Sequence, residues 1–157
     1  MPRLKQLFEK AGCTDVATYI NSGNVIFSED RLASELTSFL ETALEKEFGL
    51  TLRVLLRDKA AIDGLCHQIP DNWRNDIEQK TDVLFLWAEV NDPSIIDKVK
   101  FKPDIENVRY VDGALVWNIA RQDANRGSSI KLIQSDLYPF MTIRNINTVR
   151  KLQTMMN

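Results

Sequence analysis

The chain has 157 residues, is 44% hydrophobic and 27% charged, and carries a formal net charge of −2 at pH 7. This composition excludes an intrinsically disordered chain, and the charge gives no electrostatic reason to expect a nucleic-acid partner. No apolar run approaches the roughly 20 residues of a membrane-spanning helix, and the first residues lack the apolar core of a signal peptide.

The first half of the chain is predicted as helix, hairpin, helix and strand. Glycine favours the left-handed backbone at helix ends and tight turns, so Gly12 and Gly49 are expected to end the two helices. Asp30 is expected to cap the second helix. The predicted elements are a helix over residues 3–10, strands over 16–21 and 24–28 joined by Ser22-Gly23, a helix over 30–48 and a strand over 51–57.

Residues 58–79 are predicted as a connecting segment with a short helix at 59–68 and the turn-rich sequence IPDNWRND. The second half then reads strand, helix, hairpin, helix, strand, helix. Asp112-Gly113 is a strong hairpin signal between two β-rich runs. The predicted elements are a strand over 81–87, a helix from Pro93 to about Val99, strands over 107–111 and 114–120, a helix over 128–137 with Ile130, Leu132 and Ile133 as partial core positions, the short strand MTIRN and a closing helix.

The two halves share one order of elements, except that the first half has no opening strand. A β-α-β-β-α-β unit is a ferredoxin-like α/β plait. We therefore predict an α+β protein of two ferredoxin-like plaits in tandem, the first lacking its opening strand. The expected parts are an incomplete first plait over residues 1–57, a connection over 58–79 and a second plait with a C-terminal helix over 80–157.

Two motifs resemble those of a known family. One is the hairpin YINSGN at residues 19–24, and the other is MTIRNINTVRKL at residues 141–152. With them, the chain closely resembles the bacterial domain of unknown function 1697 family. The resemblance implies two ferredoxin-like subdomains and brings no established activity. Members usually begin with a further strand and an Arg-Gly-Ile-Asn-Val-Gly-Gly loop, and nothing here matches either. The matching residues are Tyr19, Ile20, Ser22, Gly23, Asn24, Thr142, Arg144, Asn145, Thr148, Lys151 and Leu152.

The start of the closing helix is the first candidate site. A helix N-terminus offers unpaired N–H groups to an anion, and Arg144 can add a bidentate contact to phosphate or carboxylate, with Asn145, Asn147 and Thr148 as further ligand-binding residues beside it. The alternative is that Asn147 or Thr148 only caps the helix and that Arg144 pairs with a nearby carboxylate.

Three further segments have both a functional and a structural interpretation. Ser128 and Lys131 start another helix and are expected to approach Arg144, although Ser128 also suits a plain cap. Ser22 and Asn24 lie in a hairpin turn that is either a binding loop or a turn chosen for its geometry. The other candidates favour structural roles: the Cys66-His67 pair lacks the ligands of a zinc site, and the aromatics Trp73, Trp87, Tyr110 and Trp117 suit packing better than RNA stacking.

The leading functional hypothesis is a binding domain for a small anionic ligand. The alternatives are an enzyme that processes phosphoryl or acyl-phosphate groups and a protein-interaction module that works through its sheet edges. No metal, cofactor, membrane or nucleic-acid partner is expected. Two cysteines 53 positions apart, Cys13 and Cys66, favour a cytoplasmic protein with free thiols.

The missing opening strand has its own consequences. In a plait this strand lies in the middle of the sheet, so residues 24–28 and 51–57 would each lose a partner. Either these two strands pair directly, another segment or subunit fills the gap, or the chain is an N-terminally truncated form, which we favour. We expect a first half that is less stable than the second, and self-association through exposed strand edges.

Overall fold

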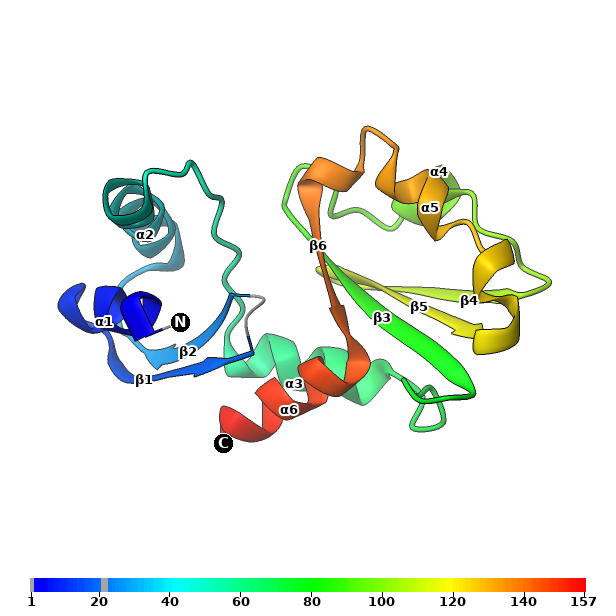
Figure 1. Cartoon of the computed structure of the whole chain (residues 1–157), viewed down its shortest axis with the longest axis horizontal. Helices are drawn as coiled ribbons and strands as arrows, with labels where there is room; N and C mark the ends of the chain where they lie inside the picture. The colour runs from blue at the N-terminus through cyan, green and yellow to red at the C-terminus, as the bar shows by residue number, and fades with distance from the viewer. Residues whose placement is uncertain (1, 21–22) are drawn as a thin grey trace. The chain divides into compact units, whose positions relative to one another are not determined.

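The computed structural model describes residues 2–20 and 23–157, and its contacts divide the chain into two compact units. Unit 1 comprises residues 1–58 with 155–157, and unit 2 comprises residues 59–154. Each unit combines helices with an antiparallel sheet and has its own apolar core, which confirms the α+β class (Figure 1).

Unit 1 packs two helices against a β-hairpin. The helix α2 buries Leu36, Leu40 and Leu44, whose spacing of four places them on one face. From α1, the ring of Phe8 lies 5.1 Å from that of Phe27 in the hairpin. The expected helices and hairpin are therefore present, with bounds α1 Pro2–Lys10, β1 Thr14–Tyr19, β2 Asn24–Ser28 and α2 Ala33–Phe48.

The expected cap of α2 was wrong. The N-cap position is Leu32, which makes no side-chain cap hydrogen bond, so Asp30 does not cap the helix. Glu29 organises this corner instead, because its carboxylate accepts the main-chain N–H groups of Asp30 and Arg31 and pairs with the Arg31 guanidinium. The side-chain hydrogen bond with Arg31, followed by those from the main chain, lowers the pKa of Glu29 to about 2.

The expected strand at residues 51–57 was also wrong. These residues form no ladder, and among the residues that the structure describes the sheet of unit 1 consists of β1 and β2. Val54 and Leu56 still pack against the core, and the Val54 N–H donates to Glu41 Oε1 at 2.8 Å. The apolar alternation is present in the sequence, but a strand also needs a partner, and residues 51–57 pair with neither described strand of unit 1.

Unit 2 contains a four-stranded antiparallel sheet with the order β4-β5-β3-β6. The expected order of strand, helix, hairpin, helix, strand and helix is present, and the hairpin turns at Asp112-Gly113. The elements are α3 Lys59–Gln68, β3 Gln79–Leu86, α4 Ile95–Val99, β4 Glu106–Val111, β5 Ala114–Ala120, the 3-10 helix η1 Arg121–Arg126, α5 Ser129–Ile133, the 3-10 helix η2 Tyr138–Phe140, β6 Met141–Asn145 and α6 Ile146–Met155.

The sheet of unit 2 lies between two helical layers, with α4 and α5 on one face and α3 and α6 on the other (Figure 1). Because both faces are covered, β5 is buried at consecutive positions rather than at alternate ones. Leu115 and Trp117 belong to the core beneath α4 and α5, while Val116 between them faces the opposite layer.

Two helices of unit 2 are shorter than expected. The helix predicted over 128–137 ends at Ile133, because the Ser135 hydroxyl donates to the Leu132 carbonyl and turns the chain. Ile130 and Ile133 are 60% and 49% exposed, so their assignment to the core was wrong. Likewise, α4 begins at Ile95, which leaves Pro93 outside the helix.

Both cysteines are free thiols. Within residues 2–20 and 23–157, no helix is long and apolar enough to cross a membrane.

Candidate functional site

Arg144 lies on β6, half-buried, opposite Val83 of β3. Its guanidinium turns back along the strand, where Nη1 donates to Thr142 Oγ1 at 2.9 Å and to the Ile143 carbonyl at 2.8 Å. Burial lowers the pKa of this arginine. The side chain that was expected to face an anion is therefore largely engaged with its own strand.

The start of α6 is capped, but not by the expected residue. Asn145 Oδ1 accepts the N–H of Thr148 at 3.0 Å, so the prediction that Asn147 or Thr148 caps the helix was wrong. Thr148 itself is buried. Asn147 is exposed, and its Nδ2 donates to the main-chain carbonyl of Asn75 at 2.9 Å.

Ser128 donates two hydrogen bonds to the buried carboxylate of Glu106. Its hydroxyl donates to Glu106 Oε2 at 2.6 Å, and its main-chain N–H donates to the other oxygen of the same group. Glu106 stands on β4 and Arg144 on β6, which are the two opposite edges of the sheet. Three strand intervals of about 4.8 Å separate them. The structure therefore does not bring Ser128 to Arg144, and Lys131 is exposed on α5.

The two candidates from the N-terminal hairpin have different outcomes. Ser22 lies outside the described residues. Asn24 is 8% exposed, and its Nδ2 donates to the Tyr19 carbonyl at 3.1 Å across the turn, in unit 1. This contact holds the turn together and supports the structural interpretation of Asn24.

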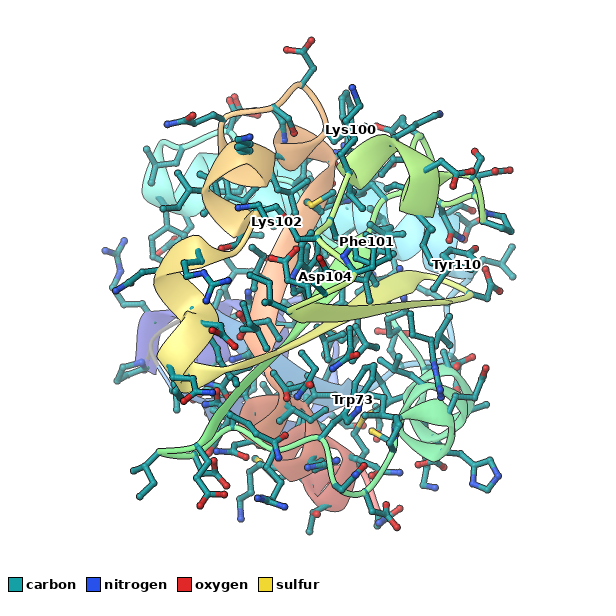
Figure 2. All side chains as sticks on the ribbon, turned by 90° about the vertical axis from the view of Figure 1, so that its right-hand side faces the viewer. Trp73, Lys100, Phe101, Lys102, Asp104 and Tyr110 are labelled. Carbon is teal, nitrogen blue, oxygen red and sulfur yellow. The ribbon has the colours of Figure 1, made fainter. Side chains whose placement is uncertain are left out.

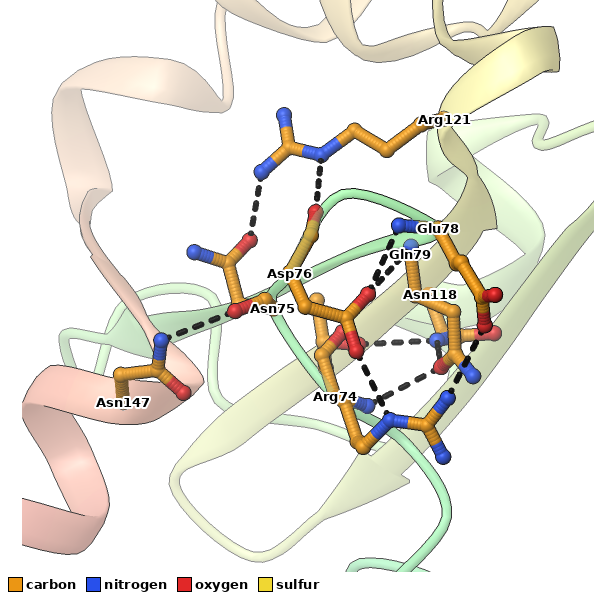
Figure 3. A network of polar contacts seen from close by, with 9 residues as sticks. Arg74, Asn75, Asp76, Glu78, Gln79, Asn118, Arg121 and Asn147 are labelled. Atoms are coloured by element: carbon orange, nitrogen blue, oxygen red, sulfur yellow. Dashed lines mark hydrogen bonds and ion pairs between the residues drawn. The ribbon is translucent and has the colours of Figure 1, made fainter.

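A polar network occupies the loop before β3, inside the segment predicted as a simple connection (Figure 3). Asp76 is its centre, since Oδ2 pairs with Arg74 Nε at 2.8 Å while Oδ1 accepts the N–H groups of Glu78 and Gln79 at 2.8 and 2.9 Å. The Arg74 hydrogen bond and then these N–H groups lower the pKa of Asp76 to about 2. The carboxylate of Asp76 is therefore ionised at neutral pH, and Arg74 balances its charge.

Side chains of the sheet anchor the inner side of this network. Asn118 on β5 donates to Thr81 Oγ1 at 2.8 Å and to Gln79 Oε1 at 3.1 Å. The Thr81 hydroxyl in turn donates to the Arg74 carbonyl at 2.7 Å. Thr81 and Asn118 are both buried, so the loop is attached to rigid strands rather than left to move freely.

Arg121 completes the outer side of the network (Figure 3). Its Nε donates to the Asp76 carbonyl at 2.9 Å, and its Nη2 donates to Asn75 Oδ1 at 3.0 Å. Asn75 is therefore bonded both to Arg121 and to Asn147, so a guanidinium, a primary amide and the first turn of α6 meet around one residue. Such a set of donors suits a phosphate or carboxylate group.

The aromatic side chains do not form one stacking platform. In Figure 2, Phe101 and Tyr110 lie on one side of the strands and Trp73 lies on the other. Trp117 is buried with its ring centroid 6.4 Å from that of Phe101. Trp73 instead lies beside Arg109, whose guanidinium carbon is 5.6 Å from the ring centroid. These contacts belong to packing on two separate faces.

A shallow depression of about 520 Å³ lies between α3 and α6, lined by Asp63, Gly64, Cys66, His67 and Gln153. Asp63 is held by Lys59 at 2.7 Å and by Gln153 at 3.0 Å, while burial raises the pKa of the Cys66 thiol. In the part of the chain that the structure describes, no three histidine, cysteine or acidic residues gather as metal ligands.

Sequence reasoning missed Arg74, Asn75, Asp76 and Arg121. Asn75 is 46 positions from Arg121 and 72 from Asn147, so no local spacing indicates that they meet. The available signal was the density of polar residues in the turn-rich sequence and an arginine that directly follows a buried strand. The turn-rich sequence was predicted as part of a connecting segment, and no role was predicted for Arg121.

Comparisons with known proteins place this chain in a family. The family model described as "Protein of unknown function (DUF1697)" matches residues 1–117, and the chain belongs to that family. A solved structure of the conserved bacterial protein SP0830 from Streptococcus pneumoniae is similar in fold. It superposes with a TM-score of 0.86 and 23% identity over 100% of this chain and 88% of that one. No curated protein matches.

Proposed function

We propose that this member of the DUF1697 family is a binding domain for a small ligand with a phosphate or carboxylate group. The proposed site consists of the Arg121 guanidinium, the Asn75 amide and the first turn of α6 at Asn147. The observation that carries the proposal is that both acceptors of Arg121 are neutral oxygens, one from a main-chain carbonyl and one from an amide.

The balance of charge around the site supports an anion. The carboxylate of Asp76, whose main-chain carbonyl accepts from Arg121, is paired with Arg74. Arg121 is exposed, and no ion pair links it to a carboxylate within residues 2–20 and 23–157. A positive charge that is held by neutral oxygens keeps its attraction for an anion.

The first turn of α6 adds directional donors. The first N–H groups of any helix have no acceptor within the helix, and the N-terminal end carries a partial positive charge. Asn145 Oδ1 accepts the N–H of Thr148, and within residues 2–20 and 23–157 no hydrogen bond engages the N–H of Ile146 or of Asn147. Of the residues expected to bind the anion, Asn147 stays in the proposed site, while Arg144 and Thr148 stabilise the structure beside it.

The proposal is for binding rather than catalysis. A general base works best when its pKa lies near the working pH, and the carboxylate of Asp76 has a pKa of about 2. The neighbouring Glu78 is engaged with Arg74 at 3.3 Å. Neither group suits the removal of a proton at neutral pH, which makes phosphoryl or acyl-phosphate processing the weaker hypothesis.

We also propose a ferredoxin-like plan for both units and a cytoplasmic location. The order β-α-β-β-α-β in unit 2, with the first strand between the third and the fourth, supports the plan. The free thiols of Cys13 and Cys66 support a reducing compartment.

A titration with inorganic phosphate and with pyrophosphate tests the binding proposal. We expect saturable shifts in the backbone NMR signals of Asn75, Arg121 and Asn147, and a rise in melting temperature with ligand concentration. Arg121→Gln removes a charge-assisted hydrogen bond worth about 1.5–3 kcal/mol. The affinity should therefore fall by roughly 10- to 150-fold.

Arg126→Gln is the matched control. Arg126 lies on the same 3-10 helix and is exposed, but it pairs with Asp123 at 3.0 Å and takes no part in the site. This variant loses the same charge, and its affinity for phosphate should stay within about threefold of the wild-type value. At physiological ionic strength, an exposed charge outside the site contributes little to the binding of an anion. If neither anion produces a saturable change in the wild type, or if both variants lose affinity equally, the proposed site is wrong.

A further inference from the structure

A row of three polar side chains on α6 leads away from the proposed anion site. The row consists of Asn147, Arg150 and Gln153, which are spaced three positions apart, so each lies beside the next on the surface of the helix. It covers about 9 Å along the helix axis. The row therefore connects the first turn of α6 with the depression between α3 and α6, which Gln153 lines (Figure 1).

The three side chains of the α6 row all donate to one continuous part of the chain, residues 63–75. The hydrogen bonds run from Asn147 to the Asn75 carbonyl at 2.9 Å, from Arg150 to the Pro70 carbonyl at 3.5 Å and from Gln153 to the Asp63 carboxylate at 3.0 Å. The row therefore faces α3 and the loop that follows it, which is also the side of the depression.

Arg150 adds a second uncompensated positive charge beside the anion site. Its contact with Pro70 is longer than the roughly 2.7–3.2 Å of an ordinary N–H···O hydrogen bond. Within residues 2–20 and 23–157, no ion pair links Arg150 to a carboxylate. Burial raises the pKa of the Cys66 thiol, and the charge of Arg150 opposes this effect, which places the guanidinium near the depression.

The depression has room for an organic group. Its volume of about 520 Å³ lies within the range of small-molecule sites, roughly 300–1,000 Å³. Gly64 leaves space in its wall, because no other part of the described chain packs within 4 Å of the place where a Cβ would lie. The imidazole of His67 and the amide of Gln153 offer hydrogen-bonding partners to hydroxyl groups and ring nitrogens. Such a lining suits the sugar and base of a nucleoside.

We propose that the anion site binds an organic diphosphate of the nucleoside diphosphate class. Its terminal phosphate lies between Arg121 and Asn147, its second phosphate contacts Arg150, and the nucleoside occupies the depression. Two guanidinium groups without a carboxylate partner match two linked phosphates better than a single anion. This inference rests on the proposed function and names the class of ligand.

Calorimetric titration of the whole chain with three probes tests the class of ligand. In buffer without divalent cations, ADP should bind at least about tenfold more tightly than AMP, which lacks the second phosphate. It should also bind at least about tenfold more tightly than pyrophosphate, which lacks the nucleoside. Equal affinities for ADP and AMP would show that Arg150 holds no phosphate, and equal affinities for ADP and pyrophosphate would show that the depression holds no nucleoside.

Arg150→Gln tests the second phosphate contact. Its affinity for ADP should fall by at least about tenfold, whereas its affinity for inorganic phosphate should stay within about threefold of the wild-type value. Arg109→Gln is the matched control. Arg109 also donates to a main-chain carbonyl, that of Gln68 at 2.7 Å, but it stands on β4, at the sheet edge opposite to β6 and α6. This variant loses the same charge and should bind ADP within about threefold of the wild type.

Cys66 is a reporter for the depression. Cys13 is only 4% exposed, so Cys66 is the thiol that N-ethylmaleimide should modify first. ADP at about ten times its Kd should slow this reaction by roughly tenfold, whereas inorganic phosphate should not slow it. The protein alkylated at Cys66 should bind ADP at least about tenfold more weakly and inorganic phosphate as before. Unchanged phosphate binding also shows that the alkylated protein is folded.

The failure of this inference differs from the failure of the proposed function. If phosphate binds at Arg121 but ADP neither depends on Arg150 nor protects Cys66, the anion site stands and the nucleoside diphosphate class is wrong. If neither phosphate nor ADP binds the wild type, both proposals are wrong.

Discussion

The two units contain the same helix–hairpin–helix arrangement with different sheets. In unit 2, β3 pairs along seven residues with β5 and along five with β6. In unit 1, β2 pairs with β1 at four positions, and one of its edges is open. The segments that follow the second helix of each unit show the same difference. Residues 141–145 form β6 beside β3, whereas residues 51–57 form no strand. A central strand therefore decides whether an apolar alternating segment can join a sheet.

The largest expected difference between the units is in local stability. We predict that amides of β3 and β5 exchange with solvent at least about 100-fold more slowly than those of β1 and β2, because a strand paired on both sides opens only with the whole unit. Hydrogen exchange on the whole chain, followed by mass spectrometry or NMR, measures both units at once. Equal protection in the two sheets would contradict the comparison.

Matched core substitutions should separate the two units. Leu40 of α2 and Leu115 of β5 are both 0% exposed, and Leu→Ala at such sites costs about 2–5 kcal/mol. We expect Leu40→Ala to unfold unit 1 at 25 °C, whereas Leu115→Ala leaves unit 2 folded with a lower melting temperature.

The chain supplies its own reporter for this experiment, because all three tryptophans, Trp73, Trp87 and Trp117, belong to unit 2. For Leu40→Ala, helical circular dichroism should fall while tryptophan fluorescence is unchanged. If both signals change together, the two units unfold as one and the distinction fails.

Glu106 should make the stability of unit 2 depend on pH. Burial raises its pKa, but hydrogen bonds from the main-chain N–H of Lys102, from the Ser128 hydroxyl and from the Ser128 N–H outweigh this effect and bring the pKa below its ordinary value of 4.5. A lowered folded-state pKa contributes stability above the unfolded-state value, and that stability is lost as the pH falls through the folded-state value.

Glu106→Gln should therefore lower the stability of unit 2 by about 1.5–3 kcal/mol at pH 7, as expected for hydrogen bonds to a charged group. The stability of the variant should also change less between pH 5 and pH 2 than that of the wild type. Urea unfolding followed by tryptophan fluorescence measures both effects. A variant whose curve runs parallel to that of the wild type would show that Glu106 does not titrate in this range.

Two glycines offer the smallest test, with opposite signs in the two units. Gly64 lies inside α3 with space for a methyl group, so Gly64→Ala should stabilise unit 2 by about 0.4–1 kcal/mol. Gly49 ends α2 with φ at 68°, so Gly49→Ala should destabilise unit 1 by about 1 kcal/mol. Thermal unfolding detected by circular dichroism measures both. Shifts of the same sign would contradict the assigned backbone roles.

The sequence alone determined most of the elements. The helix at 59–68 and the strands at 24–28, 114–120 and 141–145 have the predicted bounds. Periodicities of two and 3.6 residues and turn pairs such as Asp112-Gly113 are local signals, so they can be read without knowledge of the rest of the chain. The α+β class follows from the order of these elements.

Only the tertiary structure decided what the polar residues do. Arg144 was the most prominent arginine in the sequence, but in the structure it is half-buried on β6 and its guanidinium donates to Thr142 of the same strand. Arg121 was inconspicuous, yet the folded loop brings Asn75 to it and to the start of α6. Asn75 is separated along the chain by 46 positions from Arg121 and by 72 positions from Asn147. Whether such distant residues meet depends on the path of the whole chain, which the spacing of residues in the sequence does not indicate.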